Sequence, residues 1–226
     1  MNPKHRHGGT NSTNGSANGT ANGPVGDRSG SSSAWDARYA EAAKSDSSVW
    51  SFEPNAFVAS ILDGFAPGSA IDLACGEGRN ALWLAQRGWE VTAVDFSRVA
   101  VETGRARADR LGLEVDWIAA DVTDWSSPGL VDLIVIAYLQ LPAAELASVI
   151  ASCAGSLEPD GLIVLVAHDL DNLERGVGGP QNSAVLTSVD SLRAAAADLE
   201  IERCEQVQRP VGDAFAIDTV LVARRA

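Results

Sequence analysis

The stretch Ala70-Ile71-Asp72-Leu73-Ala74-Cys75-Gly76-Glu77-Gly78-Arg79-Asn80-Ala81 indicates how this chain folds. It begins as an apolar, strand-like run and changes to a helical pattern after Gly78. A glycine turn between a strand and a helix lets the backbone approach a ligand closely, and the helix N-terminus favours negative groups. Two glycines can also do no more than close a tight loop, so the rest of the chain has to decide between these interpretations.

Strand-like and helical segments alternate after this stretch. Helices are predicted at Arg79–Arg87, after Ser97, and from Pro142 to the turn Glu158-Pro159-Asp160-Gly161. Several of the strands are nearly continuous apolar runs, as expected of parallel strands covered on both faces. The predicted strands are Ala70–Ala74, Glu90–Asp95, Glu114–Ala119, Val131–Ala137 and Leu162–His168.

The two ends of the chain complete the predicted fold. Helices are expected at Trp35–Lys44 and from Pro54 to about Phe65. Near the C-terminus, a helix around Asp190–Asp198 precedes two strands, Ile201–Val207 and Phe215–Ala223, whose short connection requires antiparallel pairing. The sequence therefore predicts an α/β fold: a doubly wound, mostly parallel, Rossmann-like sheet of seven strands that ends in an antiparallel hairpin.

Composition sets the domain boundary and excludes several classes of function. Residues 1–33 are rich in Gly, Asn and Ser and predict a disordered tail, whereas residues 34–226 form one folded domain. The net charge of −13 disfavours nucleic acid as a partner, and no apolar run is long enough for a membrane span. The three cysteines include no CxxC pair and no secretory signal is recognisable, so we expect a cytoplasmic protein without a metal site.

Acidic residues near the ends of the first three strands predict a nucleoside site. Asp95 ends the second strand, where a carboxylate can accept hydrogen bonds from ribose hydroxyls, and Asp121 follows the third. Gly76–Ala81 fits the G-x-G-x-x-G/A dinucleotide fingerprint, which does not separate NAD from S-adenosylmethionine (SAM). Asp72, four residues before the first glycine, suits a ligand with a positively charged amino group, which SAM has and NAD lacks.

Further motifs extend this pattern over residues 35–167. They are Trp35-Asp36-x-Arg38-Tyr39, Trp50 with Pro54-Asn55, the run from Asp72 to Asn80, Val91-Thr92-Ala93-Val94-Asp95-Phe96-Ser97, Asp121-Val122, and Leu157-Glu158-Pro159-Asp160-Gly161. With them the chain resembles the class I SAM-dependent methyltransferases. Within these it looks closest to the tellurite-resistance and thiopurine methyltransferase-like branch.

The resemblance implies a role for each motif in holding SAM. The glycine loop would hold the methionine part, Asp95 the ribose, and Asp121 with the Val122 amide the adenine, while Trp35 and Tyr39 either close over the cofactor or simply pack their helix on the domain. Ala74 stands where the family usually has a glycine, so this turn must tolerate a Cβ. The full set of predicted cofactor-binding residues is Trp35, Tyr39, Asp72, Ala74, Gly76, Gly78, Asn80, Asp95, Phe96, Asp121, Val122 and Ala137.

Candidates for the acceptor side follow the later strands. His168 ends the fifth predicted strand and is either a general base or a hydrogen-bonded strand-end residue. The long segment Asp169–Ser188 is expected to form a wall or a lid of the acceptor site. Arg79, Tyr138 and Arg175 are candidate acceptor contacts, and the two arginines can equally serve charge balance on so acidic a chain.

The favoured hypothesis is methyl transfer from SAM to a small molecule. A soft anion or a thiol needs no general base, whereas a hydroxyl or an amine usually does, and the sequence leaves these acceptors open. Two alternatives come from other classes: an NAD(P)-dependent oxidoreductase, and a SAM-binding sensor without catalysis.

Overall fold

The protein is described here by a computed structural model that places residues 32–44 and 52–226. The predicted tail lies outside these residues, apart from Ser32 and Ser33 at the start of the first helix. Trp50 of the sequence motif also lies outside them.

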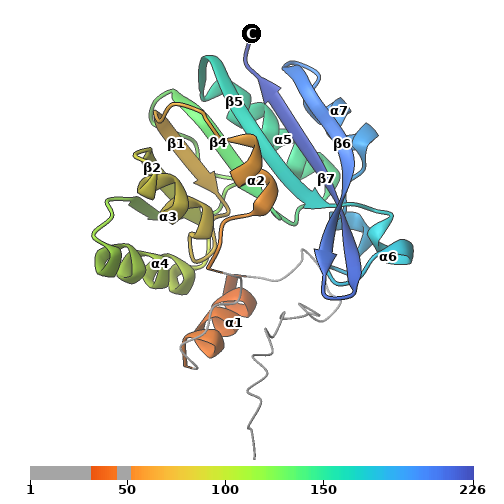
Figure 1. The fold of residues 1–226 in the computed structure, drawn as a ribbon. Helices are drawn as coiled ribbons and strands as arrows, with labels where there is room; N and C mark the ends of the chain where they lie inside the picture. Colours follow the sequence, from red (N-terminus) through yellow and green to blue (C-terminus); the bar gives the residue numbers. More distant parts are fainter. Residues whose placement is uncertain (1–31, 45–51) are drawn as a thin grey trace, which may run out of the picture.

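Seven strands form one sheet in the order β3-β2-β1-β4-β5-β7-β6 (Figure 1). Neighbours among β1 to β5 run parallel, and β7 runs antiparallel to both β5 and β6. The predicted doubly wound sheet with a closing hairpin is confirmed. The strands are β1 (Ser69–Leu73), β2 (Glu90–Asp95), β3 (Asp116–Ala119), β4 (Val131–Ala137), β5 (Leu157–His168), β6 (Glu200–Val211) and β7 (Ala214–Arg224).

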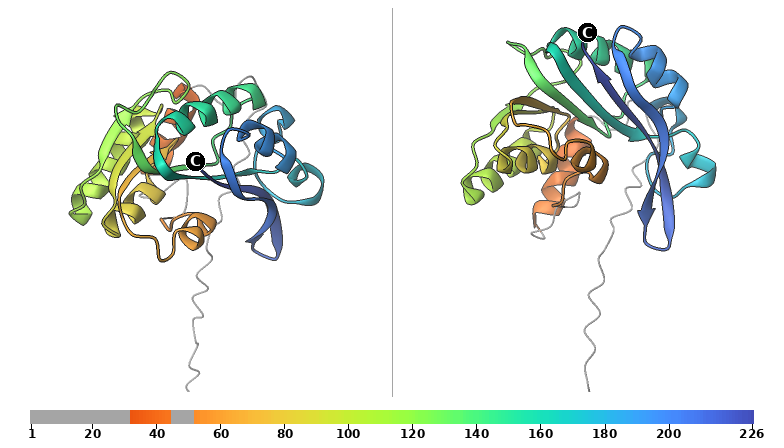
Figure 2. Two further views of the ribbon diagram at one scale, coloured as in Figure 1. Left: turned by 90° about the horizontal axis from the view of Figure 1, so that it is seen from above. Right: turned by 45° about the horizontal axis from the view of Figure 1, so that its top comes forward.

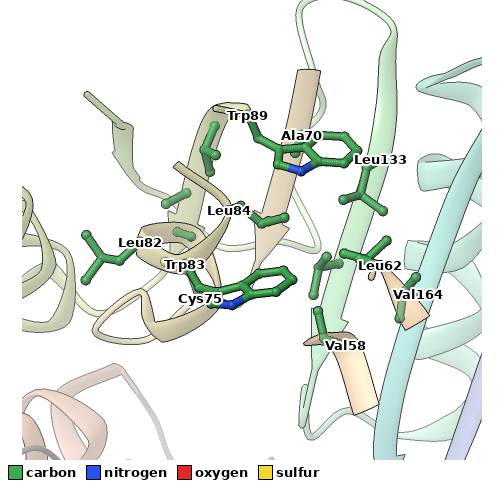
Figure 3. Close-up of a cluster of buried hydrophobic side chains, with 14 of the residues drawn as sticks. Val58, Leu62, Ala70, Cys75, Leu82, Trp83, Leu84, Trp89, Leu133 and Val164 are labelled. Carbon is green, nitrogen blue, oxygen red and sulfur yellow. The ribbon is translucent and has the colours of Figure 1, made fainter. Parts of the chain in front are cut away.

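Helices cover both faces of the sheet and create two apolar cores (Figure 2). Alternate side chains of β4 point to opposite faces, so Leu133 packs with the α2, α3 and α4 side while Ile134 packs with α5 and α7. Figure 3 shows the first of these cores, in which Trp83 and Leu84 lie near Val58 and Leu62. The helices are α1 (Ser32–Lys44), α2 (Ala56–Ile61), α3 (Arg79–Gln86), α4 (Arg98–Leu111), α5 (Ala143–Gly155), α6 (Asn172–Arg175) and α7 (Val189–Ala195), with a 3-10 helix η1 (Ser183–Val185).

The indole of Trp117 on β3 determines how closely α3 and α4 approach the sheet. A Cβ built on Gly78, which has a φ of +77°, would lie 2.2 Å from Trp117 Cη2, and one built on Gly104 would lie 2.4 Å from the same atom. Both helices therefore need glycine where they cross this buried ring. The missing side chain of Gly78 makes room for Trp117.

Several element boundaries differ from the predicted ones. The turn predicted at 158–161 belongs to β5, because Leu157 pairs with Val131 and a register shift before Leu162 accommodates the intervening residues. The helix expected up to Phe65 ends at Ile61, and β3 begins at Asp116. The hairpin turn is also shorter than predicted, since Arg209 pairs with Ala216 within the strands. This last difference brings Arg209 into the sheet.

The segment 169–188 is fastened along β7 and contains α6 and η1. The Asn172 Oδ1 accepts the Ile217 N–H at 2.7 Å, and the Val177 N–H donates to the Phe215 carbonyl at 3.0 Å. The Thr187 N–H donates to the His168 carbonyl at 3.0 Å. These bonds at three places argue against a moving lid, and no residue of the segment lines the cleft at the ends of the parallel strands, so the predicted acceptor wall is not observed.

In the part of the chain that the structure describes, no helix combines the length and the apolar character needed to cross a membrane.

Candidate functional site

An open cleft lies at the edge of the sheet where the parallel strands end. The empty space between its lining residues is about 980 Å³, including the part open to solvent. Helix α1 lies beyond this edge next to α4 (Figure 1) and contributes two aromatic side chains. The predicted site residues that line the cleft are Trp35, Tyr39, Ala74, Gly76, Arg79, Asn80, Asp95, Phe96, Asp121, Val122, Ala137 and Tyr138.

Four predicted site residues do not line the cleft. Asp72 is buried directly behind the glycine loop, and Gly78 faces Trp117. Arg175 is on the surface, where it pairs with Asp171 at 2.7 Å. His168 is stacked behind Tyr138 with its ring centroid 4.6 Å from that of the tyrosine.

Six lining residues were missed by the sequence analysis. They continue segments that were already singled out, so their position in the glycine loop, shortly after a strand end or, for Glu145, in the first turn of the next helix was the signal that could have found them. These residues are Cys75, Thr123, Leu139, Gln140, Leu141 and Glu145.

The glycine loop turns through three left-handed residues. Ala74, Gly76 and Gly78 have φ values of +59°, +56° and +77°. The loop therefore does accept a Cβ at Ala74, at the cost of about 1–2 kcal/mol for a left-handed residue that is not glycine. Strain of this kind persists where the surrounding structure fixes the backbone, and it often marks ligand sites.

Asp95 is fixed by backbone donors while it faces the cleft. Its Oδ2 accepts the Gly76 N–H and its Oδ1 accepts the Ser97 N–H, each at 2.8 Å. Burial raises the pKa of Asp95 to about 6, although both backbone donors act in the opposite direction. The remaining lone pairs of this carboxylate can accept hydrogen bonds from the hydroxyls of a ribose.

Ser97 links Asp95 to the helix over the cleft. The Ser97 hydroxyl donates to Asp36 on α1, and the Asp36 Oδ1 also accepts the Val99 N–H at 3.4 Å. This contact holds α1 against the start of α4. Trp35 and Tyr39 are thereby placed on the cleft wall.

Asp121 is exposed at the end of β3, on the same edge as Asp95. Its Oδ1 accepts both the backbone N–H of Thr123 at 3.0 Å and the Thr123 hydroxyl at 2.8 Å. These two bonds fix the turn that carries Val122 along the cleft. Asp95 and Asp121 therefore end neighbouring strands on one wall.

Asp72 is a buried carboxylate with one unsatisfied oxygen. Its Oδ2 accepts the Ala81 N–H at 2.9 Å, whereas its Oδ1 has no hydrogen-bond partner among the residues described. Burial raises the pKa of Asp72 to about 7, against the lowering effects of the Ala81 N–H and of the Arg79 charge. An orphaned carboxylate oxygen behind the glycine loop fits the charged amino group of SAM.

We expect Asp72→Asn to stabilise the protein at pH 8. Because the pKa of Asp72 is raised on folding, the folded state is favoured below pH 4 and loses stability as the pH rises through about 7. Asparagine does not ionise, so the variant should gain about 1–3 kcal/mol at pH 8, less than the full shift implies because its bond to the Ala81 N–H is weaker. Urea unfolding at pH 8 and pH 4 measures this, and an equal effect at both values would contradict it.

The far end of the cleft is built on Tyr138 and the ion pair between the buried Asp218 and the partly exposed Arg209. The Tyr138 hydroxyl donates to Asp218 Oδ2 at 2.8 Å, and the Arg209 Nε donates to that hydroxyl at 2.9 Å and to Asp218 Oδ2 at 2.8 Å. The His168 Nδ1 lies 3.1 Å from Asp218 Oδ1. Burial acts to raise the pKa of Asp218, but His168 and Arg209 more than offset it and the pKa is lowered. Asp218 is thus a fixed anion that organises three other side chains.

Tyr138 itself has a strained backbone, with a φ of +62° directly after β4. Burial and the neighbouring Asp218 raise the pKa of its hydroxyl, so Tyr138 stays neutral. On the cleft side, the Arg79 guanidinium lies 5.8 Å from the ring centroid, and burial lowers the pKa of this arginine. The ring is held from three directions and forms a rigid part of the wall.

Most of the known proteins that match this chain are named as methyltransferases, although one curated relative that is 32% identical over 104 residues is named Hemagglutinin 1. Residues 70–161 match a family model described as a methyltransferase domain. Among curated relatives, the ubiquinone biosynthesis O-methyltransferase of Rickettsia prowazekii is 26% identical over 95 residues, which is 42% of this chain and 38% of the relative. The ribosomal RNA small subunit methyltransferase C of Alcanivorax borkumensis is 34% identical over 109 residues, 45% of this chain and 33% of the relative. The chain thus matches less than half the length of these relatives.

Solved structures share the fold at low sequence identity. TehB from Haemophilus influenzae has a TM-score of 0.66 and 18% identity, and the match covers 76% of this chain and 63% of TehB. The N-methyltransferase NodS from Bradyrhizobium japonicum, in complex with S-adenosyl-L-homocysteine (SAH), has a TM-score of 0.61 and 19% identity, with 74% and 83% covered. Magnesium protoporphyrin IX methyltransferase from Synechocystis, with bound SAM, has a TM-score of 0.60 and 19% identity, with 84% and 82% covered.

Proposed function

Residues 70–161 are a methyltransferase domain within a class I SAM-dependent methyltransferase fold, and from this premise we propose that the protein transfers the methyl group of SAM to a small-molecule acceptor. The predicted resemblance, the predicted enzyme class and the predicted cofactor are thereby confirmed for the domain. The observation that carries the proposal is the pair of buried carboxylates beside the glycine loop: Asp95 faces the cleft, and Asp72 leaves one oxygen unsatisfied.

The residues of the cleft suit the parts of SAM in the order that the sequence predicted. Asp72 and the Ala74–Gly78 loop would hold the amino acid part, Asp95 the ribose, and Asp121 with Val122 the adenine. Trp35 and Tyr39 would cover the cofactor from α1. SAM supplies a methyl group that is already activated on a sulfonium, so the protein has to align the acceptor and exclude water.

We assign the acceptor to the end of the cleft at Tyr138. Arg79 and Tyr138 line this end, together with Leu139 and Leu141. A small molecule is favoured over RNA, even though one curated relative is a ribosomal RNA methyltransferase, because a net charge of −13 repels a phosphate backbone. The acidic chain with three widely spaced cysteines supports a cytoplasmic location.

His168 is the general base that we propose for a hydroxyl or amine acceptor. Asp218 pairs with the Nδ1 of its imidazole, which is the arrangement that orients a histidine for proton transfer through Nε2. Since His168 stands behind Tyr138, the proton would pass by way of a water molecule or a small shift of the ring. A thiolate or another soft anion arrives without this proton and needs no base.

Binding of SAH by wild type and Asp95→Ala tests the proposed function. Loss of hydrogen bonds to a charged group costs about 1.5–3 kcal/mol, so the dissociation constant should rise about 10- to 150-fold. Calorimetry measures the constant, and Asp124→Ala on the same edge of the fold but outside the cleft lining is the matched control. An unchanged constant for Asp95→Ala would remove this residue from the site.

The same titrations separate the other two hypotheses. Binding of NADH without binding of SAH would identify an oxidoreductase. Tight SAM binding without turnover on thiol, hydroxyl, amine and oxyanion acceptors would identify a sensor. Transfer of label from SAM to a small molecule supports the methyltransferase.

A further inference from the structure

Two guanidinium groups lie near the Tyr138 ring at the proposed acceptor end of the cleft. The Cζ of Arg79 lies 5.8 Å and the Cζ of Arg209 lies 5.6 Å from the centroid of this one ring. Burial lowers the pKa of Arg79, and the charge of Arg209 acts in the same direction. On a chain with a net charge of −13, such a pairing concentrates positive charge where the rest of the molecule is acidic.

Two of the three nitrogen groups of the Arg209 guanidinium are available as hydrogen-bond donors. Its Nε serves both the Tyr138 hydroxyl and Asp218, while its two Nη groups make no hydrogen bond to the residues that the structure describes. The side chain is 32% exposed, so these Nη groups can be reached from solvent. A guanidinium presents its donors as a planar fork that matches a carboxylate or another planar oxyanion.

The ion pair with Asp218 places this fork accurately. Asp218 is fully buried and holds Arg209, Tyr138 and His168 at once. Apolar residues of similar size often stabilise a fold as well as or better than a buried ion pair does. A role in positioning Arg209 and Tyr138 therefore explains this cluster better than stability does.

Apolar surface adjoins the two arginines. Tyr138, Leu139 and Leu141 line the same end of the cleft, and Trp35 and Tyr39 lie on its wall. Arg209 is not itself a lining residue and stands beside Tyr138, so an anion that it binds would sit at the rim of the cleft. The anionic group would then be a handle on the acceptor, apart from the atom that receives the methyl group.

We propose that Arg209, near the same Tyr138 ring as Arg79, is the specificity-determining residue that binds an anionic group of the acceptor, and that the acceptor is an organic anion whose apolar body lies against Tyr138 and Leu139. This inference rests on the proposed function, because it assigns the substrate class of the same cleft.

Calorimetric titration of the full chain with benzoate tests the inference at low ionic strength, with and without SAH. Benzoate should bind the wild type, and Arg209→Gln should weaken it about tenfold or more because charge-assisted bonds to the carboxylate are lost. Arg203→Gln is the matched control, since Arg203 lies on the same strand and pairs with Glu205 away from the cleft. SAH should bind all of these proteins equally.

Asp218→Asn provides a second variant with the same expected sign. Because Asp218 positions Arg209 and Tyr138, this substitution should weaken benzoate binding several-fold while the affinity for SAH stays the same. Either variant alone carries the test, should the other fail to fold. No saturable benzoate binding, or a benzoate affinity equal to that of the wild type in Arg209→Gln or in Asp218→Asn, would overturn the inference.

Selenite, an oxyanion without an apolar body, is the comparison ligand. Weaker binding of selenite than of benzoate supports an organic anion, and equal or tighter binding overturns that part. Failure of SAH to bind would count against the proposed methyltransferase and leaves the benzoate result readable by itself, because the titrations are also made without SAH.

Discussion

His168→Ala is expected to lower kcat about 10²- to 10⁴-fold on a hydroxyl or amine acceptor, the usual contribution of general-base assistance. Such an acceptor must lose a proton, and histidine is the side chain that ordinarily changes charge near neutral pH. The pairing of its Nδ1 with Asp218 leaves Nε2 for this task. The measurement is kcat against pH for wild type and variant, in which the acidic limb of the profile should disappear with the histidine.

The control for this prediction is the same substitution assayed with a thiol acceptor in place of a hydroxyl or an amine. On a thiol acceptor above its pKa the same substitution should change kcat little, since the nucleophile arrives deprotonated. The affinity for SAH should stay the same on any acceptor, because His168 does not line the cleft. Full activity of His168→Ala on an oxygen acceptor would leave His168 as a residue that supports Tyr138 by stacking.

Gly78→Ala is expected to cost about 2–5 kcal/mol of stability. The left-handed backbone at φ +77° is unfavourable for alanine by about 1–2 kcal/mol. In addition, the new Cβ would lie 2.2 Å from Trp117 Cη2, and forcing a buried ring to move typically costs about 1–3 kcal/mol. Urea unfolding measures the loss, and a domain of this size would melt several degrees lower for each kcal/mol.

Gly112→Ala is the matched control for the contact with Trp117. Gly112 is the C-cap of α4 with a φ of +66°, and a Cβ there meets no atom within 4 Å. This variant should therefore lose only the backbone contribution of about 1–2 kcal/mol. Equal losses at the two positions would show that Trp117 moves aside freely, and that Gly78 is required for its backbone conformation alone.

The local pattern of the sequence predicted most of the sheet and most of the residues that line the cleft. Apolar runs of strand length, separated by helices with recognisable caps such as Ser97, specify parallel crossovers because each crossover must cover one face of the sheet. Asp95 and Asp121 end neighbouring strands, so their meeting at one edge follows from the strand order. Each of these inferences depends on residues close together in the chain or on a rule of strand order.

The tertiary structure alone decided which side chains surround Tyr138, where we propose that the acceptor binds. His168, Arg209 and Asp218 come from β5, β6 and β7, and they meet Tyr138 only because the closing hairpin pairs Asp218 with both His168 and Val207. A one-residue change in either register would turn Asp218 to the other face of the sheet. The periodicity of the sequence predicted a hairpin there but not its register, and the predicted strand ended at Val207, before Arg209.

Gly78 shows the same limit, since the reason for this glycine is Trp117, a side chain 39 residues further along the chain. Sequence patterns specify which elements form, whereas contacts between side chains on distant elements depend on a register that only the packed sheet fixes.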